Sequence, residues 1–444
     1  MQKYRQSQNN PQMNAIYKTE KHSRMEVKLT DIEEKLQKDK SWQQFKKNIE
    51  DYSNSKVNQL AEDENFWKIV RSAYVLDNGV LNINHGSINT MPKIVNEALL
   101  AYSNLCNQLP GYWFFEGFNQ EKEKLRSRLA NLVGADTEEV SIQRNTSTAM
   151  ETIIFGLPLN VGDEVVLSNQ DYPTLVYAWK QREKYDGIKL HWIDIPMPTE
   201  NPELLIKAYT EKLNSKTKVL QIMQMFNWNG QLIPIEKISR KLEGSGIELV
   251  VDGAHLPAHL PVNVSTDGSQ YWGASLHKWL SAPVGTGMMT IKKELISKVR
   301  PMMGAADPES NDIRKFETFG IYNMPLELAT LTALDFLELI GLERKAARLH
   351  YLKNYCLEKL SDIPGVSTHS PMSKEFSGAL GLFSLKTISP QQLQQTLFKE
   401  YNIYTVGFEY AGISGVRISP NIYHSINEMD YFIDSVLKIS KTIT

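Results

Sequence analysis

The middle of the chain alternates between short apolar runs and segments of helical periodicity, and this alternation limits the possible folds more than any other feature. Helical patterns at 146–156, 172–185, 202–213 and 235–243 separate most of the runs. Strands that are buried on both faces and joined by helices form mostly parallel sheets covered by helices. We therefore predict an α/β fold with a mostly parallel seven-stranded sheet. The seven runs are 140–143, 164–168, 190–195, 219–226, 248–252, 271–276 and 287–291.

The N-terminal part of the chain lacks this alternation of apolar runs and helical segments. Residues 1–25 are polar and rich in Gln and Asn, so we predict a disordered arm. Residues 26–80 are predicted to form an N-terminal helical segment, in which a helix over 29–52 carries an apolar stripe. Thr30 or Asp31 is the expected cap of that helix. This segment precedes the predicted large domain, which spans residues 81–315.

Residues 316–444 are predicted to form a smaller α+β domain. The segment begins with a long amphipathic helical stretch, which we expect to break near Gly341. Short strand patterns follow at 381–385, 401–406 and 415–419, with a helix at 390–401. A cleft between two lobes is a usual ligand site, and ligands of parallel sheets bind at the carboxyl ends of the strands. Functional residues should therefore follow the strands directly.

Composition excludes several classes of protein. Lys and Arg number 49 and Asp and Glu number 51, which argues against nucleic acid or an anionic membrane surface as the main partner. No apolar run is long enough for a transmembrane helix. The two cysteines, Cys106 and Cys356, cannot form a disulfide framework and suit a reducing compartment. We expect a cytoplasmic protein, and an upstream or trimmed export segment is left open.

The segment YWGASLHKWLSAPVGTGMM (271–289) places a lysine directly after a strand. Ser275 and His277 flank Lys278, and the loop that follows is partly apolar. A lysine in such a place can have a lowered pKa and form a Schiff base with a carbonyl compound. The alternative is a surface lysine beside a turn.

The segment ELVVDGAHLPAH (248–259) ends a buried strand on Asp252. That carboxylate could bind a metal, a ribose or a protonated ring nitrogen, or it could simply cap a helix. Asp252, His255 and His259 resemble a metal-binding set, but no further ligand cluster is visible, so we predict no metal site.

The segment SIQRNTSTAM (141–150) leads from a strand into a helix through Thr146 and Ser147. Hydroxyl and backbone N–H groups at a helix N-terminus can bind an anion, although an ordinary helix cap has the same residues. The chain has no phosphate-binding loop of the Walker type and no dinucleotide-binding glycine motif after a strand.

Together, an anion site, an acid and a lysine in this order correspond to the three attachments of pyridoxal phosphate. The sequence resembles the class V branch of the fold-type I pyridoxal-phosphate enzymes, and within it the isopenicillin N epimerase-like proteins. The resemblance covers residues 75–435 and implies the fold-type I transferase fold. Its motifs are LNINHGS (81–87), RNTSTAM (144–150), VVDGAH (250–255) and LHKWLSAPVGTG (276–287).

The resemblance implies a role for each matching residue. Lys278 would be the catalytic lysine that forms the Schiff base with the cofactor. Asp252 would pair with the pyridinium nitrogen, and His255 would reach the ring hydroxyl. The residues expected to bind the cofactor phosphate are Thr146, Ser147, Ser275 and His277.

Two further residues are implied by the same resemblance. Tyr172 would stack on the cofactor ring, and Arg417 would bind the substrate carboxylate through its planar guanidinium. Without the resemblance, Tyr172 is an interface aromatic and Arg417 a surface strand residue. His85 and Tyr112 are candidates for a second base, and His85 is also predicted to bind substrate.

The chain departs from the family pattern at three places. Thr148 stands where the family often has an acid, and FETFGIYN (316–323) lacks the Gly-Thr pair that often reaches the partner's phosphate. Thr318 or Tyr322 could substitute for that pair. Residues 404–416 contain no cysteine, which argues against desulfurase activity by persulfide transfer.

The resemblance implies a homodimer that acts on a small-molecule amino acid. Lys278 would act as a general base at the α-carbon, and epimerisation or racemisation is the favoured outcome. A C–S lyase or an aminotransferase is the alternative within the family, and a non-catalytic binding protein is the alternative of another class. The aromatic stretch at 112–115 could line the substrate cleft, or it could be dimer-interface core.

Overall fold

The computed structural model describes residues 21–443, and its centre is a seven-stranded sheet with the order β2-β8-β7-β6-β5-β3-β4. Every neighbouring pair is parallel except the two that β8 forms with β2 and β7. The predicted α/β fold with a mostly parallel seven-stranded sheet is confirmed. The strands are β2 (Val140–Gln143), β3 (Glu164–Ser168), β4 (Lys189–Ile193), β5 (Thr217–Met223), β6 (Glu248–Asp252), β7 (Tyr271–Ser275) and β8 (Gly287–Ile291).

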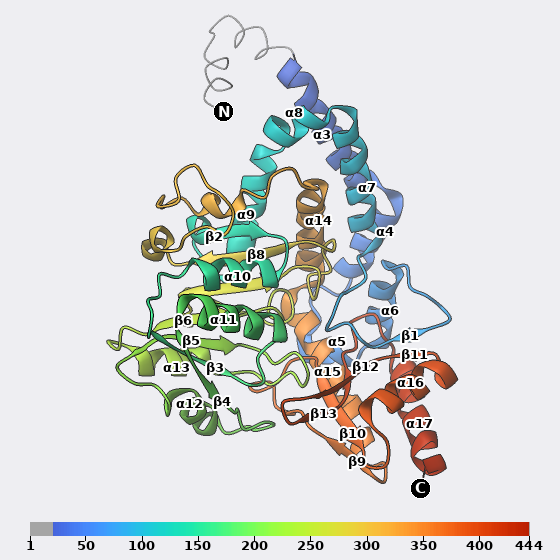
Figure 1. Ribbon diagram of the computed structural model, residues 1–444. Coiled ribbons are helices and arrows are strands. Elements are labelled where there is room, and N and C mark those ends of the chain that lie inside the picture. The colour runs from blue at the N-terminus through green and yellow to red at the C-terminus, as the bar shows by residue number, and fades with distance from the viewer. Residues whose placement is uncertain (1–20, 444) are drawn as a thin grey trace, which may run out of the picture.

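Helices cover both faces of this sheet, as the continuous apolar strands require (Figure 1). Successive strand residues point to opposite faces, so Val165 and Leu167 belong to one hydrophobic cluster and Val166 to another. Helices α10 (Thr146–Gly156) and α11 (Pro173–Asp186) supply side chains to the first cluster. The helices that supply the second include α7 (Lys93–Gln108), α9 (Asn119–Val133), α12 (Pro202–Thr210), α13 (Ile235–Leu242) and α14 (Pro325–Ile340).

A second sheet of four antiparallel strands has the order β12-β13-β10-β9 and its own hydrophobic cluster. The predicted strand over 401–406 is instead two strands, and α14 and α15 are separated at Gly341 as predicted. The elements of this lobe are α15 (Leu342–Ser361), β9 (Val366–Thr368), β10 (Gly381–Leu385), α16 (Pro390–Tyr401), β11 (Ile403–Tyr404), β12 (Val406–Tyr410), β13 (Ile413–Ile418) and α17 (Ile426–Ile443).

The N-terminal helices differ from the prediction. The predicted disordered arm over 1–25 lies outside the described residues as far as residue 20. Its last five residues are instead helical, because helix α3 (Lys21–Lys38) begins at Lys21. The single helix expected over 29–52 is wrong because Asp39 starts a new helix, α4 (Lys40–Glu50), by accepting a hydrogen bond from the backbone of Trp42. The expected caps lie inside α3. Two short helices follow, α5 (Val57–Glu62) and α6 (Glu64–Ser72).

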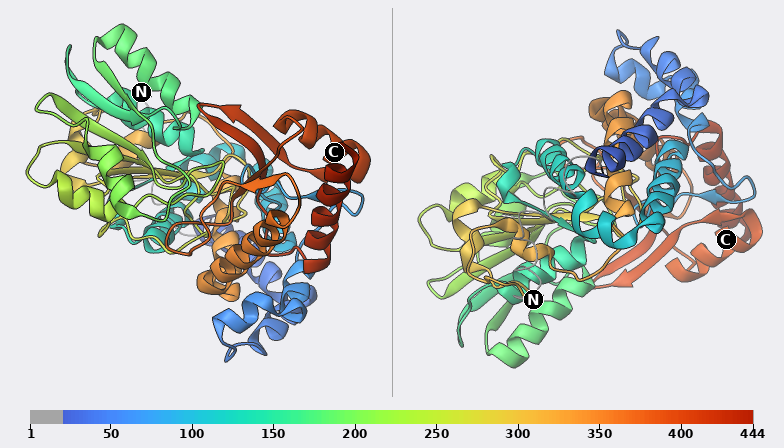
Figure 2. Two further views of the ribbon diagram at one scale, coloured as in Figure 1. Left: turned by 90° about the horizontal axis from the view of Figure 1, so that it is seen from below. Right: turned by 90° about the horizontal axis from the view of Figure 1, so that it is seen from above.

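The N-terminal helices lie at the end of the molecule away from the large sheet, and the two views of Figure 2 agree on this. Strand β1 (Leu81–Asn82) then pairs with β11 of the C-terminal lobe, while α14 packs against α7 and α9. The chain therefore crosses between the lobes near both expected domain limits, and the division at residues 81 and 316 stays a prediction. Over residues 21–443, no helix is long and apolar enough to cross a membrane.

Candidate active site

A cavity of about 520 Å³ opens at the carboxyl ends of the central strands and faces strands β12 and β13 of the other lobe. Asp252 ends β6 and Ser275 ends β7, which places both where ligands of parallel sheets bind. The fold thus brings together nine of the ten predicted site residues. They are Thr146, Ser147, Tyr172, Asp252, His255, Ser275, His277, Lys278 and Arg417.

Lys278 lies three residues beyond the end of β7, and its side chain is half-buried at the cavity. Burial lowers its pKa to about 8; the charge of Asp252 partly opposes this shift and that of Arg417 adds to it. Its Nζ atom lies 3.1 Å from Nε2 of His255. An amine with a pKa near neutrality can act both as a nucleophile and as a base.

The indole of Trp279 determines which nitrogen of His255 carries the proton. Its Nε1–H can only donate, and it lies 3.3 Å from Nδ1 of His255. Nδ1 must then be the acceptor, so Nε2 of the neutral ring carries the proton and points at Lys278. Burial also holds the pKa of His255 well below its usual range, which keeps the ring neutral.

Asp252 is buried, and one of its carboxylate oxygens, Oδ1, accepts a hydrogen bond of 2.9 Å from the backbone N–H of Ala254. Burial raises the pKa of Asp252, while the charge of Lys278 opposes the shift. A buried carboxylate that lines a cavity is a suitable partner for a protonated ring nitrogen.

The N-terminus of α10 forms a polar end of the cavity. Asn145 caps the helix, and Oγ of Ser275 accepts a hydrogen bond of 3.0 Å from the backbone N–H of Thr146. The hydroxyl groups of Thr146 and Ser275 lie 2.7 Å apart. Ser147 and His277 complete this end, where hydroxyl groups and a helix N-terminus can bind an anion.

Arg417 is a buried cation without an acidic partner. Its guanidinium donates to the backbone carbonyl of Asn227 at 2.6 Å, to Oδ1 of Asn84 at 2.5 Å and to Oγ of Ser87 at 2.8 Å. All three acceptors are neutral, and within the described residues Arg417 forms no ion pair. Burial lowers its pKa to about 10, and its Nε atom has no hydrogen-bond partner. A buried guanidinium of this kind can bind a carboxylate ligand.

The residues that hold Arg417 were not identified in the sequence, although two signals were available. Asn84 and Ser87 belong to the motif at 81–87, from which only His85 was selected. Asn227 lies four residues beyond the end of β5, lines the cavity and has a buried side-chain oxygen without a partner. Its position as a polar residue shortly after a strand is the sequence signal that could have identified Asn227.

The prediction for His85 is not supported by its position. Its ring is buried beside Tyr423 and His424, Nε2 lies 2.8 Å from the carbonyl of Asn82, and it lines a different cavity. Tyr112 lies on the short helix α8 (Pro110–Tyr112) and does not line the central cavity either.

The structure also bears on the other residues considered in the sequence. Over residues 21–443 there is no group of three His, Cys, Asp or Glu side chains that could hold a metal. Thr148 bonds to the side chain of Asn145, and Tyr322 accepts a hydrogen bond of 3.1 Å from Lys122. Neither of the two cysteines lines the cavity.

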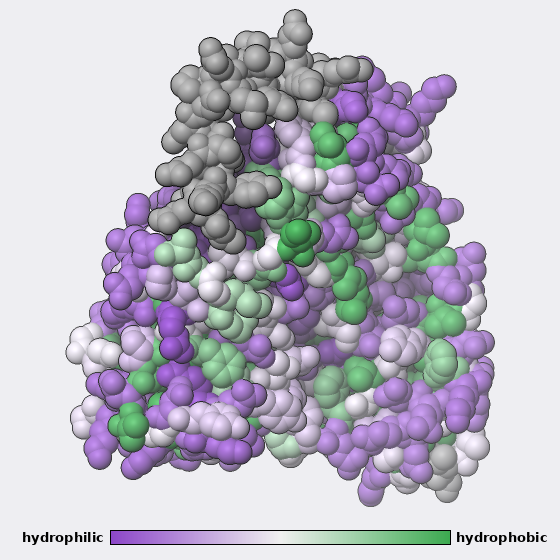
Figure 3. Space-filling model, turned by 45° about the horizontal axis from the view of Figure 1, so that its top comes forward, coloured by the Kyte–Doolittle hydropathy of each residue, from purple (hydrophilic) through white to green (hydrophobic). Residues whose placement is uncertain are grey.

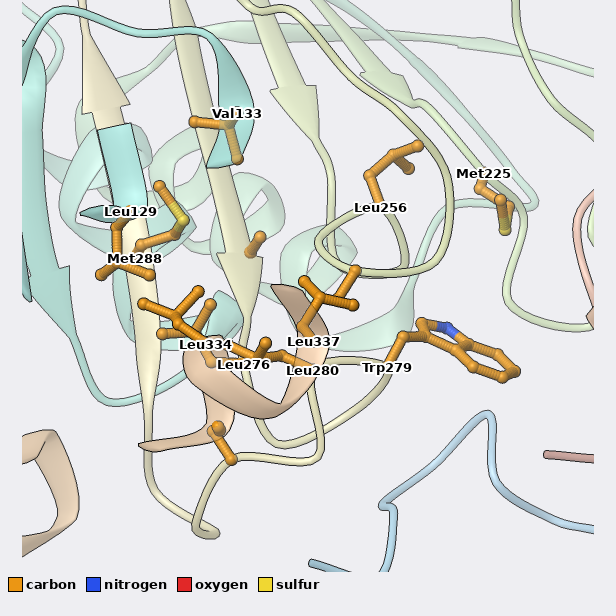
Figure 4. Close-up of a cluster of buried hydrophobic side chains, with 14 of the residues drawn as sticks. Leu129, Val133, Met225, Leu256, Leu276, Trp279, Leu280, Met288, Leu334 and Leu337 are labelled. Carbon is orange, nitrogen blue, oxygen red and sulfur yellow. The ribbon is translucent and has the colours of Figure 1, made fainter. Parts of the chain in front are cut away.

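A hydrophobic cluster holds the loop that carries Lys278 (Figure 4). Leu276 and Leu280 flank the lysine in sequence and lie beside Leu334 and Leu337 of α14. All four are almost fully buried. A loop anchored on both sides of the lysine holds that side chain in one place, which reactive groups require.

The comparisons with known proteins agree with this geometry. The profile described as "Aminotransferase class-V" matches residues 80–432. The chain is a member of the class-V aminotransferase family. It is 24% identical to the isopenicillin N epimerase of Streptomyces clavuligerus, over 83% of this chain and 97% of that protein. The predicted family is thereby confirmed.

Solved structures have the same fold. The cysteine desulfurase of Thermococcus onnurineus NA1 matches with a TM-score of 0.74 and 21% identity, over 84% of this chain and 98% of that one. A structure of the cystine C–S lyase C-DES matches with a TM-score of 0.71 and 20% identity, over 81% and 98%. A mutant of C-DES carries glycine covalently linked to its pyridoxal-phosphate cofactor.

Pyridoxal phosphate is the cofactor of this class-V enzyme. The side chains present fit that group. Lys278 offers an amine of lowered pKa, Asp252 offers a buried carboxylate, and the N-terminus of α10 offers an anion site with Thr146 and Ser275. These residues face one cavity, so one bound molecule can reach all of them.

Proposed function

We propose that this class-V enzyme acts at the α-carbon of an amino acid or amino-acid derivative, and that it is an isopenicillin N epimerase-like epimerase or racemase. One observation carries the proposal: Lys278 and Arg417 line the same cavity, and among residues 21–443 no carboxylate pairs with the buried cation of Arg417. The likeness to the epimerase of Streptomyces clavuligerus supports the reaction type.

Each side chain would have a separate task. Arg417 would bind the substrate carboxylate and so orient the α-carbon toward Lys278. Lys278 would then take the α-proton on its Nζ atom, because its lowered pKa leaves part of the amine neutral near pH 8. Pyridoxal phosphate, when bound, supplies an electron sink for the charge left at that carbon.

The remaining cofactor contacts are proposed from the same geometry. Asp252 would hold the ring nitrogen, and Nε2–H of His255 would donate to the ring hydroxyl. Thr146, Ser147, Ser275 and His277 would bind the phosphate, and Tyr172 would lie on the ring face. Tyr172 is 41% exposed, so in a single chain its ring is available for that contact.

A C–S lyase is the second candidate, and the position of His85 favours it. Epimerisation returns a proton to the face opposite the one it left, which a second acid–base group favours, whereas the loss of a leaving group can proceed with one base. His85, the predicted second base, lines a different cavity from Lys278. Desulfurase chemistry through a cysteine persulfide is not favoured, because neither cysteine lines the cavity.

Proton NMR in D₂O on the pyridoxal-phosphate-loaded enzyme, with a pool of L-amino acids and cysteine derivatives, would test the reaction. Loss of an α-proton signal followed by a D-product supports epimerisation. Release of pyruvate or a thiol identifies the lyase instead, and a keto acid with an aminated cofactor identifies the aminotransferase. The control is Lys278→Ala, which should show none of these. A Lys278→Ala enzyme with full turnover would refute the catalytic assignment, and so would the absence of any α-proton exchange by the wild type.

The enzyme is further proposed to be a homodimer. The face shown in Figure 3 is mostly hydrophilic, with apolar side chains gathered on its middle and one side. Large apolar side chains that are more than half exposed in the single chain include Phe115, Val284 and Ile321. Covering such side chains by a second copy would remove apolar surface from water. Sedimentation at micromolar concentration should give twice the mass of 50.7 kDa.

A further inference from the structure

Behind the cavity lies a histidine that no part of the proposed reaction uses. His259 is fully buried, and its ring packs on the indole of Trp279 with 4.1 Å between the ring centroids. Nδ1 lies 2.8 Å from the backbone carbonyl of His255, and Nε2 accepts a hydrogen bond of 2.8 Å from the backbone N–H of Ala379. One ring therefore contacts both residues that hold Lys278 in place and also a segment of the other lobe.

The partners of His259 determine its protonation. The backbone N–H of Ala379 can only donate, so Nε2 is unprotonated and Nδ1–H donates to the carbonyl of His255. A doubly protonated ring would break the bond to Ala379. Burial holds the pKa of His259 at about 3, which agrees with a ring that stays neutral. His259 is thus a fixed connection, not a group that titrates during the reaction.

The segment that His259 holds leads directly to the proposed carboxylate site. Ala379 comes two residues before β10, and Leu382 of β10 is paired with Arg417 of β13. The backbone of this segment lies close to His259, since a Cβ atom at Gly378 would lie 2.6 Å from its ring. A shift at Ala379 would therefore move the strand pair that carries Arg417.

We infer that His259 is a positioning residue that fixes the place of Arg417 relative to Lys278. The inference rests on the proposed function, because it takes Arg417 as the carboxylate-binding group. The bond to Ala379 joins the lobe that carries Arg417 to the loop of His255, and His255 contacts Nζ of Lys278 at 3.1 Å. Loss of the bond should weaken the recognition of the carboxylate and leave the binding of an amine unchanged.

The test compares two ligands that differ in one carboxylate. L-Alanine and ethylamine are titrated into the pyridoxal-phosphate-loaded enzyme, and the cofactor absorbance gives the Kd of each. In His259→Phe, which keeps the ring on Trp279 but loses both nitrogens, the preference for L-alanine should fall about tenfold. His259→Gln, whose amide oxygen can accept from Ala379, should restore most of it.

A second readout does not depend on the cofactor. Amide hydrogen exchange in the cofactor-free chain should be faster at Ala379 in His259→Phe than in the wild type, and His259→Gln should restore the protection. Ser377→Ala is the matched control, since it removes the bond between Lys353 and Ser377 but keeps the bonds of Gly378 to the Gly230 carbonyl and of Ala379 to His259. Its ligand preference should equal that of the wild type.

Three results would overturn the inference: an unchanged preference in His259→Phe, an equal weakening of both ligands, or an equal loss of preference in Ser377→Ala. A wild-type enzyme that binds L-alanine no better than ethylamine would be a different failure. It would remove the proposed role of Arg417 itself, and the inference would fall with it.

Discussion

The lowered pKa of Lys278 has a measurable consequence for the cofactor-free enzyme. The folded protein lowers that pKa from 10.5 to about 8, mainly by burial, so the charged amine is disfavoured in the native state. At pH 7 both states are largely protonated, and the charge then costs the folded state about 3 kcal/mol. The unfolded state binds more protons between the two pKa values, so the stability contributed at this site rises with pH across that window.

The variant Lys278→Met isolates this effect, because methionine fills similar space without a charge. At pH 7 the cofactor-free variant should be more stable than the wild type by about 3 kcal/mol, and at about pH 9.5 by only about 1 kcal/mol. Urea unfolding followed by tryptophan fluorescence at both pH values gives the difference. Titrating groups that do not interact with Lys278 are common to the two proteins and cancel, whereas Asp252, His255 and His277 lose the charge of Lys278 in the variant.

The result that would refute this reasoning is a stability difference that does not change between the two pH values. The pKa of Lys278 in the folded protein would then be ordinary. Its role as a base near neutrality would need pyridoxal phosphate to create it, and the fold would not supply it. A variant that is less stable than the wild type at both pH values, with an unchanged pH slope, would show that methionine packs poorly there.

Three further outcomes follow from the geometry. Arg417→Lys should lower the affinity for L-alanine about tenfold or more in titrations, with cofactor binding unchanged, since an ammonium cannot make the planar paired contact. Glu317→Gln should cost about 3 kcal/mol in urea unfolding, because the fully buried guanidinium of Arg126 keeps only the part-exposed carboxylate of Glu123 and Lys122 loses its ion pair with Glu317. Gly253→Ala should destabilise by about 1–3 kcal/mol in the same assay, because the new Cβ would lie 2.0 Å from the indole of Trp272.

The central sheet could be predicted from the sequence because each strand is a short run buried on both faces. Such runs keep their apolar character whichever strand they pair with, so they can be recognised without the fold. The N-terminal helices could not be placed as well. The stretch at 29–52 is amphipathic throughout, and the break depends on one side chain, Asp39, which bonds to the backbone of Trp42 and starts a new helix. The helical periodicity of the apolar residues continues across this break, so the pattern alone predicts one helix.

Some residues of the candidate site could likewise be predicted from local sequence, and others could not. Asp252 and Ser275 end two strands, and Lys278 follows one of them by three residues, so their place could be predicted from local sequence alone. His85 shows the limit of that reasoning. Its neighbours Asn84 and Ser87 bond to Arg417 at the central cavity, whereas its own ring bonds to the carbonyl of Asn82 and lines a different cavity. Which residue of a turn faces a site depends on the turn, and sequence position does not reveal it.

The carboxylate-binding end of the cavity is a property of the assembled fold. Arg417 lies on β13, which pairs with β10. Its guanidinium is held by Asn84, just after β1, and by the carbonyl of Asn227, in the loop after β5. No two of these segments are neighbours in sequence. The cofactor end is built instead from residues that each follow a strand of a single sheet. Changes that loosen the contact between the lobes should therefore affect the recognition of the carboxylate before they affect the binding of pyridoxal phosphate, and His259 lies at the point where that contact reaches the lysine loop.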